Sequence, residues 1–350
     1  MNVSLNIIDR STPPIAPKGV AKRNSMFDSH GRQIRDLRLS VTDRCNFRCI
    51  YCMEPDVKYM PKMQLLTLEE YIRLIEVSIS LGVTRLRITG GEPTLYPDLD
   101  ELLYAIGNLG LEDVAMTTNG SLLTPAIAKR WKSLGLHRIT VSLDTLRPDR
   151  KDAITRSHTP LDTVIRAIDI ARDTGLTPVK VNAVMMRGVN DDEVSDFAEF
   201  ARVHRVDMRL IEFMALDAGR AWSMDKVVPA SEMLKNIRRD HELVPEDDPP
   251  SSTSINFRFR NGGGRIGIIA SVTRSFCGAC DRLRIMADGT VRPCLFSDDE
   301  WCIRPLLRGG ASDDDLRTFI TNAVWAKSAG HGMGRPDFVR PEKTMSTIGG

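Results

Sequence analysis

The chain has 350 residues, of which 42% are hydrophobic and 27% are charged, and this balance is typical of a globular enzyme. A chain of this length can bury a large core without metal or disulfide cross-links, so its seven cysteines are free for chemistry. The net charge of +2 argues against the strongly basic surface of bulk nucleic-acid binding. No run approaches the roughly 18 apolar residues of a membrane span, and we expect neither nucleic-acid nor membrane partners.

The N-terminal segment, residues 1–34, lacks the apolar stretch of a secretory signal and carries Asp9 and Asp28. We interpret it as a mobile leader before the first strand. An odd number of cysteines without an export signal indicates a reducing compartment. The sequence therefore predicts a cytoplasmic location.

Short β-rich runs then alternate with amphipathic helical runs. We predict strands at 36–43, 83–90, 113–118, 138–144, 178–186 and 207–213, and helices at 67–82, 124–135 and 161–175. Each of these helices ends at a glycine, which is a common stop signal. Alternation of this kind is typical of βαβ units and of a parallel sheet. Six such units, with right-handed crossovers, suggest an open or partial barrel as readily as a doubly wound sheet.

The alternation stops after about residue 215. A loop rich in Pro, Asp and Ser at 241–254 precedes an expected hairpin, in which 255–260 and 265–270 flank the turn "NGGG". A second group of cysteines, a helix near 314–328 and a glycine-rich tail follow. We therefore divide the chain into the leader, a core at 35–240 and a C-terminal extension at 241–350.

Six of the seven cysteines form two trios. Closely spaced thiolates favour zinc or iron–sulfur ligation. A structural zinc site takes four ligands, and neither trio has a histidine at ligand spacing. Spacing therefore favours iron–sulfur clusters, each with one iron open to another ligand, while zinc in two sites or in one shared site stays the alternative. The first trio is Cys45, Cys49 and Cys52, the second is Cys277, Cys280 and Cys294, and Cys302 is interpreted as a packing residue.

The first trio, with Tyr51 before its last cysteine, resembles the signature of the radical S-adenosylmethionine superfamily. The motif "GGEP" at 90–93, which binds the methionine amino group of the cofactor in that superfamily, is a second mark. The resemblance narrows to the GTP 3′,8-cyclase family (molybdenum cofactor biosynthesis protein A) and extends from about Asp36 to Gly350. The motifs that carry it are "TTNG" at 117–120, "VSLDTL" at 141–146, "KVN" at 180–182, "CDRLR" at 280–284 and the terminal "IGG".

This resemblance implies an α/β fold, a partial TIM-type barrel of about six βα units with a C-terminal extension that carries a second iron–sulfur site. It also implies two [4Fe-4S] clusters and S-adenosyl-L-methionine as cofactors. In the family, reductive cleavage of S-adenosylmethionine yields a 5′-deoxyadenosyl radical that removes the C3′ hydrogen of GTP. The C3′ radical attacks C8, and the product is (8S)-3′,8-cyclo-7,8-dihydroguanosine 5′-triphosphate, the first step of molybdenum cofactor biosynthesis.

The resemblance also assigns site residues. It assigns the first trio to the cluster that binds S-adenosylmethionine and the second trio to a cluster that meets the guanine of GTP. The S-adenosylmethionine contacts that it implies are Tyr51, Gly91, Ser142 and Met214, all expected at the carboxyl ends of strands. The GTP contacts that it implies are Arg38, Arg87, Thr117, Lys180, Arg282 and Arg284, the last two acting together with the terminal Gly349 and Gly350.

Several alternatives stay open from the residues alone. Arg38, Arg87 and Lys180 lie among apolar neighbours, where each cation could instead form an ion pair with a carboxylate such as Asp144 or Glu212. The terminal glycines could be a frayed end. Asp281 stands where the family more often has Asn, which leaves the hydrogen bonding near the second trio open.

Partners follow from the family as well. They are GTP, a low-potential flavodoxin or ferredoxin as electron donor, cyclic pyranopterin monophosphate synthase downstream, and a second copy of the chain in a homodimer. Two other functions remain. One is a different radical S-adenosylmethionine enzyme that matures a peptide or cofactor with an auxiliary cluster. The other is a zinc-stapled protein that binds nucleic acid.

Overall fold

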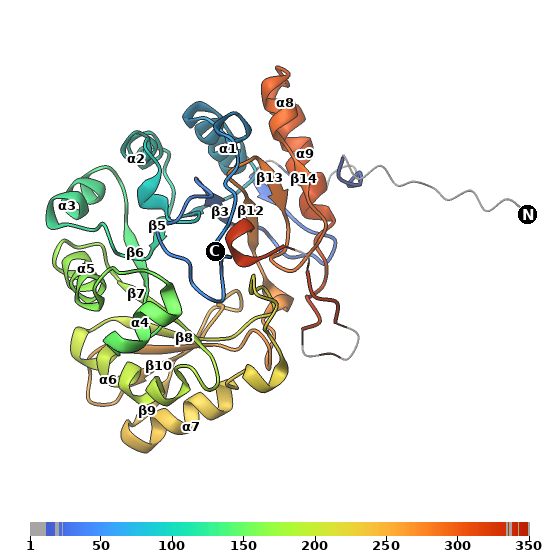
Figure 1. Ribbon diagram of the computed structural model, residues 1–350. Helices are drawn as coiled ribbons and strands as arrows, with labels where there is room; N and C mark the ends of the chain where they lie inside the picture. The colour runs from blue at the N-terminus through green and yellow to red at the C-terminus, as the bar shows by residue number, and fades with distance from the viewer. Residues whose placement is uncertain are drawn as a thin grey trace, which may run out of the picture.

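The computed structural model describes residues 12–17, 21–22, 24–333, 335, 338–341 and 343–348. Their centre is a 12-stranded sheet in the order β14-β13-β12-β3-β4-β5-β6-β7-β8-β11-β10-β9. The sheet curves, and most of the helices lie in an arc around its outer side, whereas the helix at Pro148–Thr155 (α4) lies inside this arc (Figure 1). Across this part of the chain no helix is both long and apolar enough to cross a membrane.

The six strands predicted from the sequence are confirmed, and all five pairings between them are parallel. The three predicted helices are confirmed as well. Each ends just before a glycine with a positive φ, at Gly82, Gly135 and Gly175. The strands are β3 (Asp36–Ser40), β4 (Arg85–Thr89), β5 (Asp113–Thr118), β6 (Arg138–Ser142), β7 (Lys180–Met185) and β8 (Asp207–Glu212), and the helices are α1 (Leu68–Ser80), α3 (Pro125–Ser133) and α5 (Leu161–Asp173).

The other helices fill the connections between strands. They are α2 (Leu99–Gly107), α4 (Pro148–Thr155), α6 (Val194–His204) and α7 (Ala230–Asp240). Short 3-10 turns lie at η1 (Lys62–Gln64), η2 (Pro93–Leu95), η3 (Asp191–Glu193), η4 (Met224–Lys226), η5 (Cys277–Ala279) and η6 (Met345–Thr347).

The extension completes the sheet at both edges. The predicted hairpin is confirmed as β10 (Ile255–Phe259) and β11 (Arg265–Ile269), and β11 pairs in parallel with β8. At the opposite edge β12 (Arg282–Ile285) pairs in parallel with β3. The remaining elements are β9 (Leu243–Pro245), β13 (Thr290–Arg292), β14 (Trp301–Cys302), α8 (Arg304–Arg308) and α9 (Asp313–Trp325), the last confirming the predicted helix.

Alternation along the strands separates the core from the concave side of the sheet. Leu37 and Leu39 of β3 are completely buried, as is Ile88 of β4, and all three belong to the main hydrophobic cluster. Successive side chains of a strand point to opposite faces. Arg38 and Arg87 therefore face the concave side, where the site is found.

The end of the predicted leader is folded. The strands β1 (Ala21–Lys22) and β2 (Ser25–Met26) pair with each other, and Met26 and Ile34 are fully buried in the main core. The prediction of a mobile segment is therefore wrong for residues 24–34, because apolar side chains fix them to the core. The division of the chain at 34 and 240 stays a prediction.

Candidate active site

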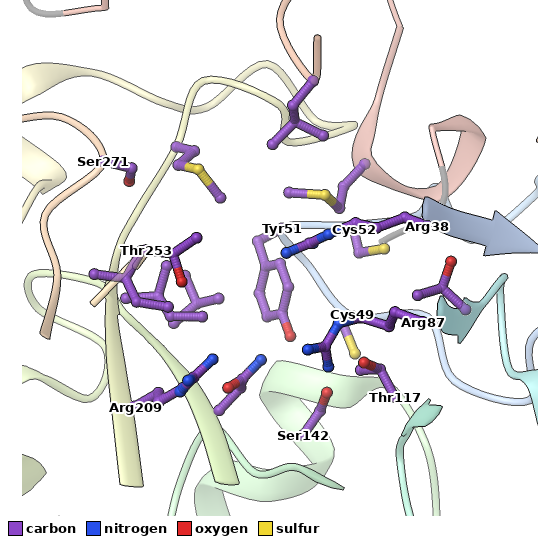
Figure 2. A pocket seen from close by; sticks show the side chains of 18 of the residues that line it. Arg38, Cys49, Tyr51, Cys52, Arg87, Thr117, Ser142, Arg209, Thr253 and Ser271 are labelled. Atoms are coloured by element: carbon purple, nitrogen blue, oxygen red, sulfur yellow. The ribbon is translucent and has the colours of Figure 1, made fainter. Parts of the chain in front are cut away.

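One cavity of about 300 Å³ lies on the concave side of the sheet and is lined by both cysteine trios. Figure 2 shows Arg38 and Arg87 directed into it, beside Tyr51. Lys180 is not among the residues that line the cavity, and Gly349 and Gly350 lie outside the described residues. The predicted site residues that line it are Arg38, Cys45, Cys49, Tyr51, Cys52, Arg87, Gly91, Thr117, Ser142, Met214, Cys277, Cys280, Arg282, Arg284 and Cys294.

The first trio lies on a loop that follows β3. The carbonyl of Cys49 accepts hydrogen bonds from the amides of Cys52 at 2.9 Å and Met53 at 3.1 Å, which form a tight turn. The phenol of Tyr51 donates a 2.7 Å hydrogen bond to Asp144, which follows β6. The carboxylate of Asp144 also accepts from the amide of Val184 at 2.9 Å. The loop is therefore tied to the carboxyl ends of β6 and β7.

The "GGEP" motif packs against the start of this loop. An added Cβ at Gly91 would lie 2.2 Å from the carbonyl oxygen of Arg44, so only glycine allows the two backbones to approach this closely. Glu92 is buried and accepts hydrogen bonds from the Thr118 hydroxyl at 2.6 Å and the Asn119 amide at 2.7 Å. The Glu92 carboxylate thus links the carboxyl ends of β4 and β5 at the site.

The thiols of the two trios differ in acidity. Burial raises the pKa of Cys45 to about 11 and that of Cys52 to about 12. Burial would also raise the pKa of Cys280, but the charges of Arg282 and Lys327 outweigh it and lower that pKa to about 6. Metal ligation needs thiolates. The second trio therefore offers a thiolate at neutral pH, whereas the first trio would release protons when metal binds.

Three arginines form a row across neighbouring strands, of which Arg284 is buried and Arg38 and Arg87 are half-buried. Arg284 of β12 is the register partner of Arg38 of β3, which is the register partner of Arg87 of β4. Each has one buried guanidinium nitrogen for which no described residue serves as acceptor. Burial, followed by the charge of Arg38, lowers the pKa of Arg87 to about 9. Unfilled donors on buried cations are costly, and an anionic ligand in the cavity would satisfy them.

The alternative ion pairs do not form. The Asp144 carboxylate accepts hydrogen bonds from the Tyr51 hydroxyl and the Val184 amide instead. Glu212 accepts from the backbone amides of Ala230 at 2.8 Å and Val272 at 2.7 Å, which lie away from the arginine row. The carboxylates proposed as partners are thus occupied elsewhere.

Two cations on β7 and β8 extend the positive charge. Burial, followed by the charge of Arg209, lowers the pKa of Lys180 to about 7. Lys180 does not line the cavity itself, but by strand alternation it lies on the same face of β7 as Asn182, which does. Arg209 itself lines the cavity (Figure 2), and the sequence analysis missed it. Its position between the buried Met208 and Leu210 repeats the pattern of Arg38, a cation between two apolar residues of a strand, and this pattern could have identified it.

The second trio lies against Arg282. The guanidinium of Arg282 donates to the Cys280 sulfur, with Nε at 3.3 Å and Nη2 at 3.2 Å, and lies 5.0 Å from the ring centre of Phe276. Lys327, which follows α9, was also missed. Its buried amine lines the cavity and donates 2.6 Å hydrogen bonds to the carbonyls of Arg282 and Pro293. No local sequence pattern marks such a lysine.

Asp281 and Cys302 lie outside this cavity. The carboxylate of Asp281 forms an ion pair with Arg85, and its carbonyl accepts from the amides of Arg35 and Asp36. Its side chain therefore stabilises the strand ends and does not line the site. Cys302 lies on β14, and its sulfur is 3.6 Å from the carbonyl oxygen of Asp288.

The donor set fits an iron–sulfur cluster better than a zinc ion. A zinc ion holds its thiolates at about 2.3 Å and so gathers them tightly. The thiols of each trio line one shared cavity, and neither trio has a histidine at ligand spacing to complete a tetrahedral zinc site. Three thiols suit a cluster with one open iron.

Comparisons with known proteins identify the class of fold. The model of the Radical SAM superfamily matches residues 39–201, and that of Molybdenum Cofactor Synthesis C matches residues 206–333. Among solved structures, SuiB of Streptococcus suis has a TM-score of 0.59 at 14% identity, covering 87% of this chain and 68% of that chain. A second structure, native anSMEcpe with bound AdoMet, has a TM-score of 0.55 at 17% identity, with 83% and 82% covered. Fold and first cysteine loop together define a radical S-adenosylmethionine protein.

Relatives with assigned functions identify the family within this class of radical S-adenosylmethionine proteins. A protein of Streptomyces coelicolor named GTP 3′,8-cyclase is 44% identical over 330 residues, which cover 93% of this chain and 96% of that protein. The mitochondrial GTP 3′,8-cyclase of Arabidopsis thaliana is 41% identical over 329 residues, covering 93% and 83%. The chain belongs to the GTP 3′,8-cyclase family. Membership implies a [4Fe-4S] cluster and S-adenosylmethionine, as the sequence predicted.

Proposed function

We propose that this chain converts GTP to (8S)-3′,8-cyclo-7,8-dihydroguanosine 5′-triphosphate, the first step of molybdenum cofactor biosynthesis. One observation carries the proposal: a single cavity is lined by both cysteine trios and by arginines that each keep a shielded nitrogen without an acceptor. Thiols can hold iron–sulfur clusters and guanidinium groups can hold a triphosphate, so this combination suits radical chemistry on GTP. The names of the relatives support the same activity.

The first trio would hold the cluster that binds S-adenosylmethionine. When bound, these cofactors supply the 5′-deoxyadenosyl radical that takes the C3′ hydrogen of GTP. The protein's part is to place the reactants and to exclude water. Gly91 would support the cofactor's methionine end through its backbone, because the missing side chain lets this segment lie directly against the first cysteine loop. The proposed contacts to S-adenosylmethionine are Tyr51, Gly91, Ser142 and Met214.

The row of arginines would hold the triphosphate. Guanidinium groups match phosphate oxygens with paired hydrogen bonds, and the row offers several such donors on one wall. The second trio would hold a second [4Fe-4S] cluster that meets the guanine. The proposed GTP contacts are Arg38, Arg87, Thr117, Lys180, Arg282 and Arg284, to which the cavity adds Arg209.

The remaining parts of the proposal rest on the family alone. They are a cytoplasmic location, a homodimer, a flavodoxin or ferredoxin donor, and a cyclic pyranopterin monophosphate synthase that takes the product onward. Gly349 and Gly350 are proposed to work with Arg282 and Arg284 at the substrate.

The test is an assay of protein purified without oxygen. Two [4Fe-4S] clusters predict about eight irons per chain, and a chemical reductant with S-adenosylmethionine and GTP should give 5′-deoxyadenosine and the cyclic product. The variant Cys294→Ser should still form 5′-deoxyadenosine but no cyclic product. Cys302→Ser is the matched control, because this thiol does not line the cavity, and it should behave as wild type.

Other outcomes would change the proposal. Formation of 5′-deoxyadenosine without any product from GTP would favour a maturase with an auxiliary cluster. Full cyclisation by the Cys294→Ser variant would remove the second trio from the proposed mechanism. Colourless protein that contains zinc even after cluster reconstitution would contradict the radical chemistry itself.

A further inference from the structure

A buried arginine from the N-terminal segment contacts the second cysteine loop. The side chain of Arg32 donates hydrogen bonds from Nη1 to the carbonyls of Cys277 at 2.8 Å and Ala329 at 3.0 Å, and from Nη2 to the carbonyl of Ser328 at 2.6 Å. Its Nε donates to Asp28 at 2.5 Å. All three nitrogens of the guanidinium are therefore in use, and three of the four acceptors belong to the C-terminal extension.

Asp28 fixes the orientation of this arginine. The Asp28 carboxylate is completely shielded from solvent and also accepts from the amides of His30 and Arg32, each at 2.9 Å. Backbone hydrogen bonds from Gly31 to Asp28 and from Asp28 to Arg32 close the turn between them. The guanidinium is thus held in place before the extension packs against it, which lowers the entropy cost of each contact.

The segments that Arg32 joins are walls of the site. Cys277 belongs to the second trio, and Ser328 and Ala329 directly follow Lys327, the buried lysine that lines the cavity. The next residue, Gly330, packs on the second trio, since an added Cβ there would lie 3.4 Å from the Cβ of Cys277. Arg32 therefore bridges two chain segments that meet at the Cys277 side chain.

We propose that Arg32 is a positioning residue for the second trio, so that the N-terminal segment forms part of the second cluster site. The proposal rests on the two-cluster function proposed above. The region lies before both matched domains, which begin at residues 39 and 206. Without the guanidinium, three carbonyls lose a charged donor, and the backbone that carries Cys277 is free to move away from the other two thiols. A cluster needs its thiolates placed together.

The test compares Arg32→Met with Arg35→Met. Arg35 is the matched control, because it lies three residues away, is exposed, and bonds through its side chain to Gln33. Each protein is purified without oxygen and reconstituted. Measurements are iron and sulfide content, electron paramagnetic resonance of both reduced clusters, and cleavage of S-adenosylmethionine without GTP.

We expect wild type and Arg35→Met to hold about eight irons per chain and Arg32→Met about four. The remaining cluster of Arg32→Met should have the spectrum of the first cluster and should cleave S-adenosylmethionine at the wild-type rate, which shows that the barrel is folded. Arg32→Lys keeps the charge but not the fork of donors, so it should retain part of the second signal. A general loss of stability would reduce both clusters alike and would contradict a positioning role.

Two further results would overturn the inference. A second cluster of unchanged amount and unchanged spectrum in Arg32→Met would mean that Cys277 needs no such support. If Arg32→Met is insoluble, Arg32→Lys and Asp28→Asn take its place, and an undiminished second signal in both of them would overturn the inference. About four irons in the wild type would refute the two-cluster proposal itself, and that result is distinct from any failure confined to the Arg32 variants.

Discussion

Arg38 and Arg284 face each other as register partners on the adjacent parallel strands β3 and β12. Arg284 is buried and Arg38 is half-buried, and each retains a shielded nitrogen for which the described residues offer no acceptor. Two positive charges on directly paired residues of adjacent strands repel each other in a region of low dielectric. The free enzyme therefore stores an unfavourable interaction that a polyanionic substrate would relieve.

The first prediction separates stability from binding at Arg87. Desolvation and the neighbouring charge of Arg38 both disfavour the charged form of Arg87, so an apolar residue of similar size removes an unfavourable interaction. Arg87→Met should therefore raise the thermal midpoint of the protein without ligand. It should also weaken GTP binding at least about tenfold, because a charged hydrogen bond contributes about 1.5–3 kcal/mol. Thermal unfolding and calorimetric titration with GTP measure the two effects.

Arg138 provides the control for this experiment. It carries the same group on β6 but forms an ion pair with Asp113, and it does not line the cavity. Arg138→Met should lower the thermal midpoint and leave GTP affinity nearly unchanged. If Arg87→Met instead destabilised the free protein as Arg138→Met does, the arginine row would be a structural network and not a preformed anion site.

The second prediction concerns pH and Lys180. Burial, followed by the charge of Arg209, lowers the pKa of this amine to about 7 in the free protein, and a bound triphosphate would raise that pKa. Above pH 7, GTP binding should therefore take up a proton, and affinity should fall as the pH rises from 7 towards 9. Calorimetry in buffers of different ionisation enthalpy detects the proton uptake directly.

Lys180→Arg is the comparison, since arginine stays charged across this range. Ionisation of the triphosphate itself affects both proteins equally, so the difference between their pH profiles reports the lysine. The same shift predicts a stability effect: the folded pKa lies below the unfolded one, so stability without GTP should rise between pH 7 and about pH 10. Identical pH profiles for both proteins would rule out titration of Lys180 in the binding step.

The third prediction compares two glycines beside the cysteine trios. An added Cβ at Gly91 would lie 2.2 Å from a backbone oxygen of the first cysteine loop, whereas one at Gly278, inside the second trio, would meet nothing within 4 Å. Gly91→Ala should therefore displace the loop, with loss of S-adenosylmethionine binding and of the first cluster. Gly278→Ala should keep the wild-type iron content. Iron analysis and equilibrium binding of S-adenosylmethionine measure both, and a normal Gly91→Ala protein would mean that the loop relaxes easily.

The fourth prediction concerns the C-terminal tail. Ile348 is completely buried against Leu216 and Met286, and Met345 lines the cavity. The chain is therefore buried beside the cavity at residue 348. Deletion of Gly349 and Gly350 should leave both clusters and S-adenosylmethionine cleavage intact and lower product formation from GTP about tenfold or more. Addition of one Ala after Gly350 tests the space available. Product formation at the wild-type rate by the shortened chain would make the glycines a frayed end.

The parts of the site that sequence could predict are those with local patterns. The strand carrying Arg38 shows a two-residue alternation, and the loop with Cys45 follows it directly, so both could be placed from the residues alone. The partners of these elements could not. The pairing of Arg284 with Arg38 joins strands almost 250 residues apart, and nothing local specifies it. Arg32 and Lys327 were missed for the same reason, because each acts through distant backbone carbonyls.

The placement of β12 beside β3 and of β11 beside β8 has a consequence for biosynthesis. A ribosome releases the central strands first, and both outer edges of that intermediate present unpaired backbone groups. The edges are covered only when the last third of the chain has emerged, so the nascent core is exposed to aggregation until then. The second trio is complete only when Cys294 has been synthesised, whereas the first is complete at Cys52, so the two proposed cluster sites form at different stages of synthesis.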